Sequence, residues 1–177
     1  MKKQSKQLMI LLVVLIFLIA GYFGLQKYYE VQTEKEQEET RQVLIDVTRD
    51  DISAFTFDYE GKSYSFEKKE DTWYYTEDNS IEINQNRILA MLNGVSPLYA
   101  EQEIANVTDM VQYGLDKPSK TITIQAENVS YTIEAGAYNS FSSVYYVRFP
   151  GETTVYTVKA QAITTFDRDM DDLKVEE

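Results

Sequence analysis

The sequence contains neither cysteine nor histidine, and these two absences exclude several kinds of chemistry. A chain without cysteine forms no disulfide, has no thiolate nucleophile and cannot carry the lipid of a lipoprotein. A chain without histidine has no imidazole to bind a metal or to activate a serine. The common hydrolase mechanisms are therefore not available, and we expect no cofactor.

Positive charge is also scarce, because 17 Lys and Arg residues stand against 29 Asp and Glu residues, for a formal net charge of −12. Nucleic-acid binding depends on cations that displace the counterions of the phosphate backbone. Nucleic acid is therefore not an expected partner. A length of 177 residues predicts one domain with additional segments, since a domain typically takes about 100 to 200 residues.

One long apolar run lies near the amino terminus. Residues 8–25 contain no charged side chain, and a helix of this length, rising about 1.5 Å per residue, approaches the roughly 30 Å hydrocarbon thickness of a bilayer. We predict an uncleaved transmembrane signal anchor over residues 8–27, in contact with the lipid bilayer. A cleaved signal peptide is the alternative, but the run exceeds the usual length of about 7 to 15 apolar residues and no A-x-A site follows.

The charges on either side of this run predict its orientation. Lys2, Lys3 and Lys6 precede it, whereas the first acidic residue is Glu30. The positive-inside rule places residues 1–7, a basic stub, in the cytoplasm and the carboxy-terminal domain outside. We therefore predict a single-pass protein of the cell membrane. Beyond residue 27 only 13 cationic residues remain against the 29 acidic ones, so that part has a formal charge of −16.

A polar segment over residues 28–44 connects the apolar run to the first strand pattern. It is rich in Glu and Gln and contains no Gly or Pro, which favours a helix, but no broad apolar stripe is present. We predict a helical stalk. A dimerising coiled coil is the alternative, although about two heptads fit here and three or four are needed. The oligomeric state stays open.

Alternating apolar and polar residues from Ile45 onward indicate half-buried strands. Residues 52–59 and 63–68 predict a hairpin, and residues 72–76 predict a third strand. Apolar residues then recur at helical spacing over residues 84–94, with Asn at the first position as the N-cap and Gly near the end. The first half therefore reads strand, strand, strand, helix.

The second half shows a similar order. Residues 121–126 and 130–135 predict one hairpin, residues 144–149 and 154–158 predict another, and a closing helix is expected over residues 159–173. This pattern extends the strand, strand, strand, helix order by one strand. Internal repetition is therefore a hypothesis for the fold.

Together these patterns predict the α+β fold class: an N-terminal transmembrane helix, then an antiparallel β-sheet domain over residues 45–173 built of two helix-closed halves. Residues 174–177 are an acidic tail. The segments FDYEGKSYSFE, from Phe57, and IQAENVSYTIE, from Ile124, share the pattern S-Y-(S/T)-(F/I)-E. This short match is what raises the hypothesis of internal duplication.

A polar connection over residues 108–118 (TDMVQYGLDKP) links the two halves. Asp109 is placed to cap a helical turn, Gly114 can end it with a positive φ, and Pro118 prevents its continuation. Leu115 is then expected to dock as a hydrophobic clasp after the turn.

This connection belongs to a wider set of residues that resembles a known family. The set consists of Trp73, Tyr113-Gly114-Leu115-Asp116-x-Pro118, the strand Thr121-Ile-Thr-Ile124, Ile133-Glu-Ala-Gly136, Tyr145-Tyr-Val147 and Val155-Tyr156-x-Val158. Over about residues 45–173 the chain resembles the bacterial domain-of-unknown-function 4340 (DUF4340) family, and the Y-G-L-D-x-P motif is the most specific part. The resemblance implies a membrane-anchored domain outside the cytoplasm, in some members similar to auxiliary parts of ABC-type transporters, without established catalytic residues.

Paired carboxylates are a route to hydrolysis that needs no histidine. Two acidic groups about 5 to 9.5 Å apart can act on a glycosidic bond, and Glu101 with Glu103, or Asp58 with Glu134, offers such a pair. An envelope enzyme acting on cell-wall glycan is therefore the alternative function. Most small acidic domains contain such pairs by chance, so we predict that the protein is not an enzyme.

Two further motifs carry weaker signals. The run from Asp167 to Asp172 resembles the first half of a calcium loop, but Asp172 stands where that loop requires Gly. Calcium binding therefore stays open, and no metal site is predicted. Ser119 and Lys120 are adjacent, yet neighbouring residues of a strand point to opposite faces, which argues against a serine–lysine nucleophile pair.

Aromatic residues make up 13% of the chain, and 14 of them are tyrosine. Tyr74 with Tyr75, and Tyr145 with Tyr146, each present one ring to the core and one to the opposite face of a strand. With Trp73 they are candidate recognition residues for a glycan or an envelope protein, although burial as sheet residues is the simpler interpretation. The predicted function is a non-catalytic binding or accessory domain of the envelope, with an ABC-type transporter complex as one setting.

Overall fold

The computed structural model describes residues 41–175, together with Leu15, Ile19, Gly21, Tyr22, Leu25 and Lys27. The chain divides into two compact units, Met1–Arg41 and Gln42–Glu177. Within the described residues no helix is long and apolar enough to cross a membrane. The predicted transmembrane helix over residues 8–27 is therefore not part of the described fold. Most of that segment lies outside the described residues, as do residues 28–40 of the predicted stalk.

Most of the regular secondary structure of the second unit is β-strand. In chain order its elements are β1 (Val43–Ile45), η1 (Arg49–Asp51), β2 (Ile52–Tyr59), β3 (Lys62–Lys69), β4 (Thr72–Tyr75), α2 (Gln85–Asn93), β5 (Leu98–Tyr99), β6 (Gln102–Ile104), η2 (Val111–Tyr113), β7 (Lys120–Ala126), β8 (Val129–Asn139), β9 (Val144–Arg148), β10 (Val155–Lys159), α3 (Ala160–Thr164) and α4 (Met170–Leu173). The hairpins and the α2 helix predicted from sequence periodicity are present.

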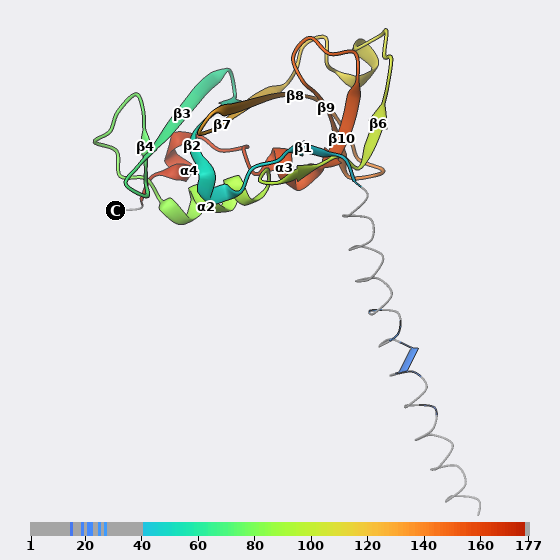
Figure 1. Cartoon of the computed structure of the whole chain (residues 1–177), viewed down its shortest axis with the longest axis horizontal. Coiled ribbons are helices and arrows are strands. Elements are labelled where there is room, and N and C mark those ends of the chain that lie inside the picture. The colour runs from blue at the N-terminus through green and yellow to red at the C-terminus, as the bar shows by residue number, and fades with distance from the viewer. Residues whose placement is uncertain are drawn as a thin grey trace, which may run out of the picture. The chain divides into compact units, whose positions relative to one another are not determined.

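Eight of these strands form one antiparallel sheet in the order β4-β3-β2-β7-β8-β9-β10-β6 (Figure 1). β2 lies between β3 and β7, so strands of the two predicted halves are neighbours in a single sheet. The separate pair β1-β5 forms a small second sheet. Val43 and Leu44, which we assigned to the stalk, belong to β1.

The predicted α+β fold class is wrong, because the domain is mostly β-sheet and the strands of both predicted halves form one eight-stranded antiparallel sheet. The helices that follow the strands are short, with nine, five and four residues. The closing helix expected over residues 159–173 ends at Thr164, and a second helix begins only at Met170. Thr and Asp are weak helix formers, and burial of Phe166, which is 0% exposed, draws the intervening chain toward the core.

We call the side of the sheet that carries Phe55 and Phe57 the inner face. Both rings are almost fully buried, and Phe55 stacks on Phe66 with ring centroids 4.9 Å apart. Helices α2, α3 and α4 lie on one side of the arched sheet (Figure 1). Asn84 caps α2, because its Oδ1 accepts a hydrogen bond from the backbone N–H of Arg87 at 3.3 Å. The main hydrophobic core fills the space between the inner face and these helices.

The opposite side, the outer face, carries small hydroxyl side chains where the two similar hairpins meet. Thr56 is the register partner of Thr123. The hydroxyl of Thr56 lies 3.0 Å from that of Ser65, and the hydroxyl of Thr123 lies 3.0 Å from that of Thr132. The two segments with shared sequence are therefore equivalent hairpins lying side by side in one sheet.

Candidate functional site

The Y-G-L-D-x-P motif forms a structural clasp. The backbone N–H of Val111 donates to the Asp109 carboxylate at 3.0 Å, and the following 3-10 turn η2 ends at Gly114, whose φ is 66°. Leu115 is 0% exposed and packs with Val107 and Val155 in a second hydrophobic cluster. The clasp therefore holds the connection between the halves against the sheet.

Close backbone contact explains why β8 carries glycine opposite this clasp. A Cβ atom at Gly136 would lie 2.2 Å from the carbonyl oxygen of Tyr113 and 2.9 Å from the carbonyl carbon of Gly114. Asp116 is exposed and Pro118 is partly exposed at the end of the motif. The arrangement is one of packing, and none of these residues lines the pocket described below.

The first group of candidate aromatic residues is split between the two faces of the sheet. Trp73 and Tyr75 are 2% and 8% exposed and belong to the core. Trp73 meets the ring of Phe55 edge-on, with centroids 5.2 Å apart. Tyr74 points the other way and is partly exposed, with Lys69 Nζ 5.9 Å above its ring. Of Trp73, Tyr74 and Tyr75, only Tyr74 is therefore accessible to a partner.

Tyr145 and Tyr146 are also separated by the strand. Tyr145 packs against the main core, whereas Tyr146 packs in the second cluster with its ring centroid 4.9 Å from that of Tyr113. The five candidate aromatics therefore do not form one continuous strip, because side-chain direction alternates along β4 and β9.

Neither candidate carboxylate pair lines the pocket described below, and one of the four residues has a basic partner. Glu134 accepts a hydrogen bond from Arg148 Nε at 2.7 Å, and β7 separates its strand from the one that carries Asp58. Glu101 and Glu103 flank the start of β6, an edge strand, and neither lines the pocket described below. The structure thus brings no predicted acid pair into that pocket.

Acidic residues of the run over residues 167–172 form ion pairs and a helix cap within the domain. Asp167 forms an ion pair with Lys120, Asp169 caps α4 by accepting from the Asp172 N–H at 3.0 Å, and Asp171 pairs with Lys174 at 2.7 Å. Among the residues that the structure describes, no group of three or more acidic side chains is gathered to hold a metal ion.

Lys120 is a buried cation on the inner face, with 6% of its side chain exposed. Burial lowers the pKa of this ammonium group, while the Asp167 carboxylate opposes that shift. Its Nζ also lies 5.3 Å from the centroid of the Tyr59 ring. Ser119 points elsewhere and donates to the carbonyl oxygens of Ala135 and Gly136 at 3.1 and 3.2 Å. Lys120 therefore ties the segment after α3 to the sheet.

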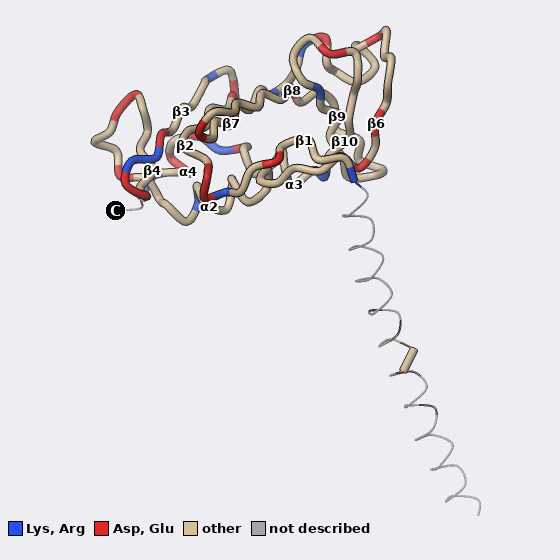
Figure 2. Tube along the Cα trace, in the orientation of Figure 1, with Lys and Arg blue, Asp and Glu red and all other residues tan. Residues whose placement is uncertain are grey.

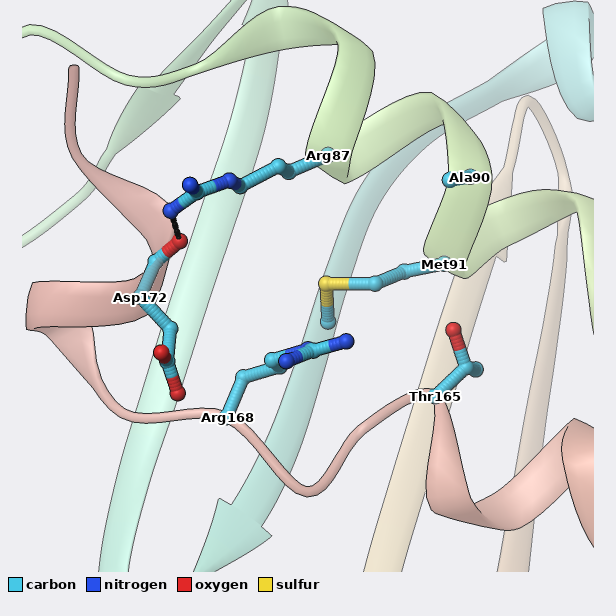
Figure 3. A pocket seen from close by; sticks show the side chains of 6 residues that line it. All are labelled: Arg87, Ala90, Met91, Thr165, Arg168 and Asp172. Carbon is cyan, nitrogen blue, oxygen red and sulfur yellow. Dashed lines mark hydrogen bonds between the residues drawn. The ribbon is translucent and has the colours of Figure 1, made fainter. Parts of the chain in front are cut away.

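A surface pocket of about 310 Å³ opens between α2 and the segment from Thr165 to α4. It is lined by Arg87, Ala90, Met91, Thr165, Arg168 and Asp172, whose side chains surround it in Figure 3. Pockets for small ligands have volumes of about 300 to 1,000 Å³, so this one suits a small group. The Met91 side chain and Ala90 supply an apolar wall.

Charged side chains of both signs line this pocket. An Nη of Arg87 donates to the backbone carbonyl of Asp172, which ties α4 to α2. Arg168 and Asp172 are both exposed, and their charged groups form no ion pair with each other in the described part of the chain. Acidic and basic residues are both spread over the domain (Figure 2), and two arginines share this opening with Asp172.

Sequence patterns did not identify this pocket. Arg87 lies in the predicted helix and Arg168 in the acidic run over residues 167–172, and neither pattern pointed to a shared pocket. Only the packing of α2 beside the broken carboxy-terminal helix brings them to one opening.

The fold and the pocket together define a class of protein: an antiparallel β-sheet domain that offers a small, mixed-charge surface pocket. The chain belongs to the family described as Domain of unknown function (DUF4340), whose family model matches residues 73–177. This match runs from β4 to the carboxyl end and includes the clasp and the pocket residues. No curated protein and no solved structure matches the chain.

Proposed function

We propose that this protein is a non-catalytic recognition domain of the cell envelope, where it acts as an accessory subunit that binds a small zwitterionic group. The observation that carries the proposal is the pocket lined by Arg168 and Asp172, which offers a cation and an anion to one ligand. Because an arginine guanidinium suits a carboxylate and a carboxylate suits an ammonium group, a very short peptide that carries both groups fits this pair.

A location outside the cytoplasm makes such a ligand available. The cations that precede the apolar run, followed by the acidic domain, support export of the domain. Short peptides, including fragments of the stem peptides of the cell wall, are then accessible to it. An ABC-type transporter complex is the setting that the family resemblance implies.

Removal of the Arg168 charge is expected to weaken ligand binding about tenfold, because a hydrogen bond to a charged group contributes roughly 1.5–3 kcal/mol. The dipeptide D-Ala-D-Ala serves as the probe, and binding is followed by the chemical shifts of backbone and arginine side-chain N–H groups. The matched control is Lys117→Ala, which removes the same charge from an exposed site that is not part of the pocket.

Blocked forms of the dipeptide separate the two charges of the pocket. Acetylation of its amino group is expected to weaken binding to the wild-type protein but to have little effect on Asp172→Asn, whose carboxylate is already absent. A neutral dipeptide, acetylated and amidated, should bind poorly to both. Equal binding of all forms, or equal losses for Arg168→Ala and Lys117→Ala, would exclude the proposed recognition.

The location has its own test. A reporter enzyme that is active only outside the cytoplasm, fused to the carboxyl terminus of the full chain, is expected to be active. The control carries the same fusion with Lys→Glu changes before the apolar run, which make the charge on that side negative. A stable but inactive wild-type fusion would contradict an extracytoplasmic location.

A further inference from the structure

A phenylalanine stands fully exposed at the tip of the β8–β9 hairpin. Phe141 is 99% exposed, whereas Tyr138, the next most exposed aromatic residue of the described part of the second unit, is 48% exposed. Scattered apolar side chains on a protein surface are common. A ring that makes almost no contact with its own domain is different, because its whole apolar surface is offered to solvent.

Hydrogen bonds of Asn139 and of the backbone stabilise the turn at this tip. Asn139 Oδ1 accepts hydrogen bonds from the backbone N–H groups of Phe141 at 3.0 Å and Ser142 at 3.3 Å. The amide of Asn139 donates to the Tyr146 hydroxyl at 3.1 Å. The carbonyl of Ser143 accepts from the N–H of Ala160 at 3.0 Å, which anchors the tip to the start of α3. Phe141 therefore lies on a hydrogen-bonded turn.

Aromatic rings support the base of this turn. Tyr138 and Tyr145 face each other across the hairpin, with ring centroids 5.1 Å apart. An ordered anchor loses little conformational entropy when it is buried by a partner, which favours binding. Aromatic residues in such positions are typical of the few side chains that supply most of the affinity of an interface.

We propose that Phe141 is an anchor that inserts into an apolar pocket of a partner protein. Its neighbours in the turn, Ser140, Ser142 and Ser143, are exposed and polar, and this matches an interface with an apolar centre and a polar rim. The proposal concerns a surface that shares no residue with the charged pocket, so either can fail without the other.

A membrane and a second copy of this chain are the two other occupants to consider, and the charge of the molecule argues against both. An anionic membrane repels a chain with a net charge of −12, and the turn itself carries no Lys or Arg that would offset the repulsion. A single ring is also a weak lipid anchor. A second copy of this chain has the same net charge of −12, which disfavours self-association.

Photocrosslinking tests the contact in the full chain. Benzoylphenylalanine is placed at position 141 in one variant and at Glu152, an exposed residue in the β9–β10 turn, in the control. We expect a discrete protein adduct in intact cells from position 141 and none from position 152. The adduct should disappear from isolated membranes when purified wild-type domain competes, and should persist with Phe141→Ser domain as the competitor.

Binding to the captured partner measures the contribution of the ring. Phe141→Ser should weaken binding about 10- to 100-fold, Phe141→Leu less than Phe141→Ser, and Glu152→Ser not at all. The free energy of unfolding should be unchanged in Phe141→Ser, because the side chain is exposed. The absence of an adduct, an adduct with twice the mass of the chain, or binding to anionic lipid vesicles that Phe141→Ser abolishes would each overturn the proposal.

Discussion

Replacement of Gly136 by alanine is expected to destabilise the domain by about 3 kcal/mol or more. The added Cβ would lie 2.2 Å from the Tyr113 carbonyl oxygen and 2.9 Å from Gly114 C, both of which are backbone atoms. Such atoms move only if the clasp leaves the sheet. Because Leu115 is 0% exposed, that movement would also expose its side chain and open the second hydrophobic cluster.

Thermal and urea unfolding, followed by circular dichroism, measure this effect. A loss of this size corresponds to a decrease of roughly 10 °C in the melting temperature of a domain of this length. The matched control is Gly151→Ala, because Gly151 has a φ of 81° but no atom within 4 Å of an added Cβ. The control reports backbone strain alone, about 1 kcal/mol. Equal losses in the two variants would show that Gly136 is not held by close contact.

Replacement of Asp167 by alanine is expected to destabilise the domain by about 2 kcal/mol at neutral pH, because it leaves the buried Lys120 ammonium without its anion. Loss of one partner of a fully buried pair costs about 3–5 kcal/mol. The Asp167 side chain is 43% exposed, so solvent screening reduces that effect. The double change Lys120→Met with Asp167→Ala should recover part of the loss, because it also removes the buried charge.

The pH dependence of this loss has a defined sign. Burial lowers the pKa of Lys120 below its ordinary value of 10.5, and Asp167 counteracts the shift, so the pKa falls further in the variant. Between the folded pKa and 10.5 the unfolded chain binds a proton that the folded chain lacks, and stability rises with pH. The destabilisation caused by Asp167→Ala should therefore shrink as the pH rises toward 10.5.

Urea unfolding at pH 7 and at pH 10 provides the measurement. Asp171→Ala is the control, because it removes a carboxylate from the exposed pair with Lys174, whose side chains are 82% and 50% exposed. An exposed pair contributes about 0–1 kcal/mol, so this variant should change little. A loss for Asp167→Ala that is equal at both pH values would contradict the role of the Lys120 charge.

Signals that act over a few residues were sufficient to predict the main strands and the start of α2. The alternation of Phe55 and Phe57 predicts a strand with one buried face, and Asn84 predicts the start of α2, because each signal acts over a few residues. β5 and β6 have two and three residues, which is too short for any periodicity to appear. The continuous helix after residue 159 was wrong because helical spacing of apolar residues did not reveal the turn around Phe166.

The sequence by itself determined the exclusion of thiol and imidazole chemistry, the acidic character of the chain, the two similar hairpins and the tight turn at Gly114. Each of these follows from residue types or from backbone preferences over short distances. Only the tertiary structure decided that β2 pairs with β7, that Lys120 meets Asp167, that Arg87 and Arg168 share a pocket and that Phe141 stands free. These contacts depend on how segments far apart in the chain pack together, and no pattern within one segment specifies them.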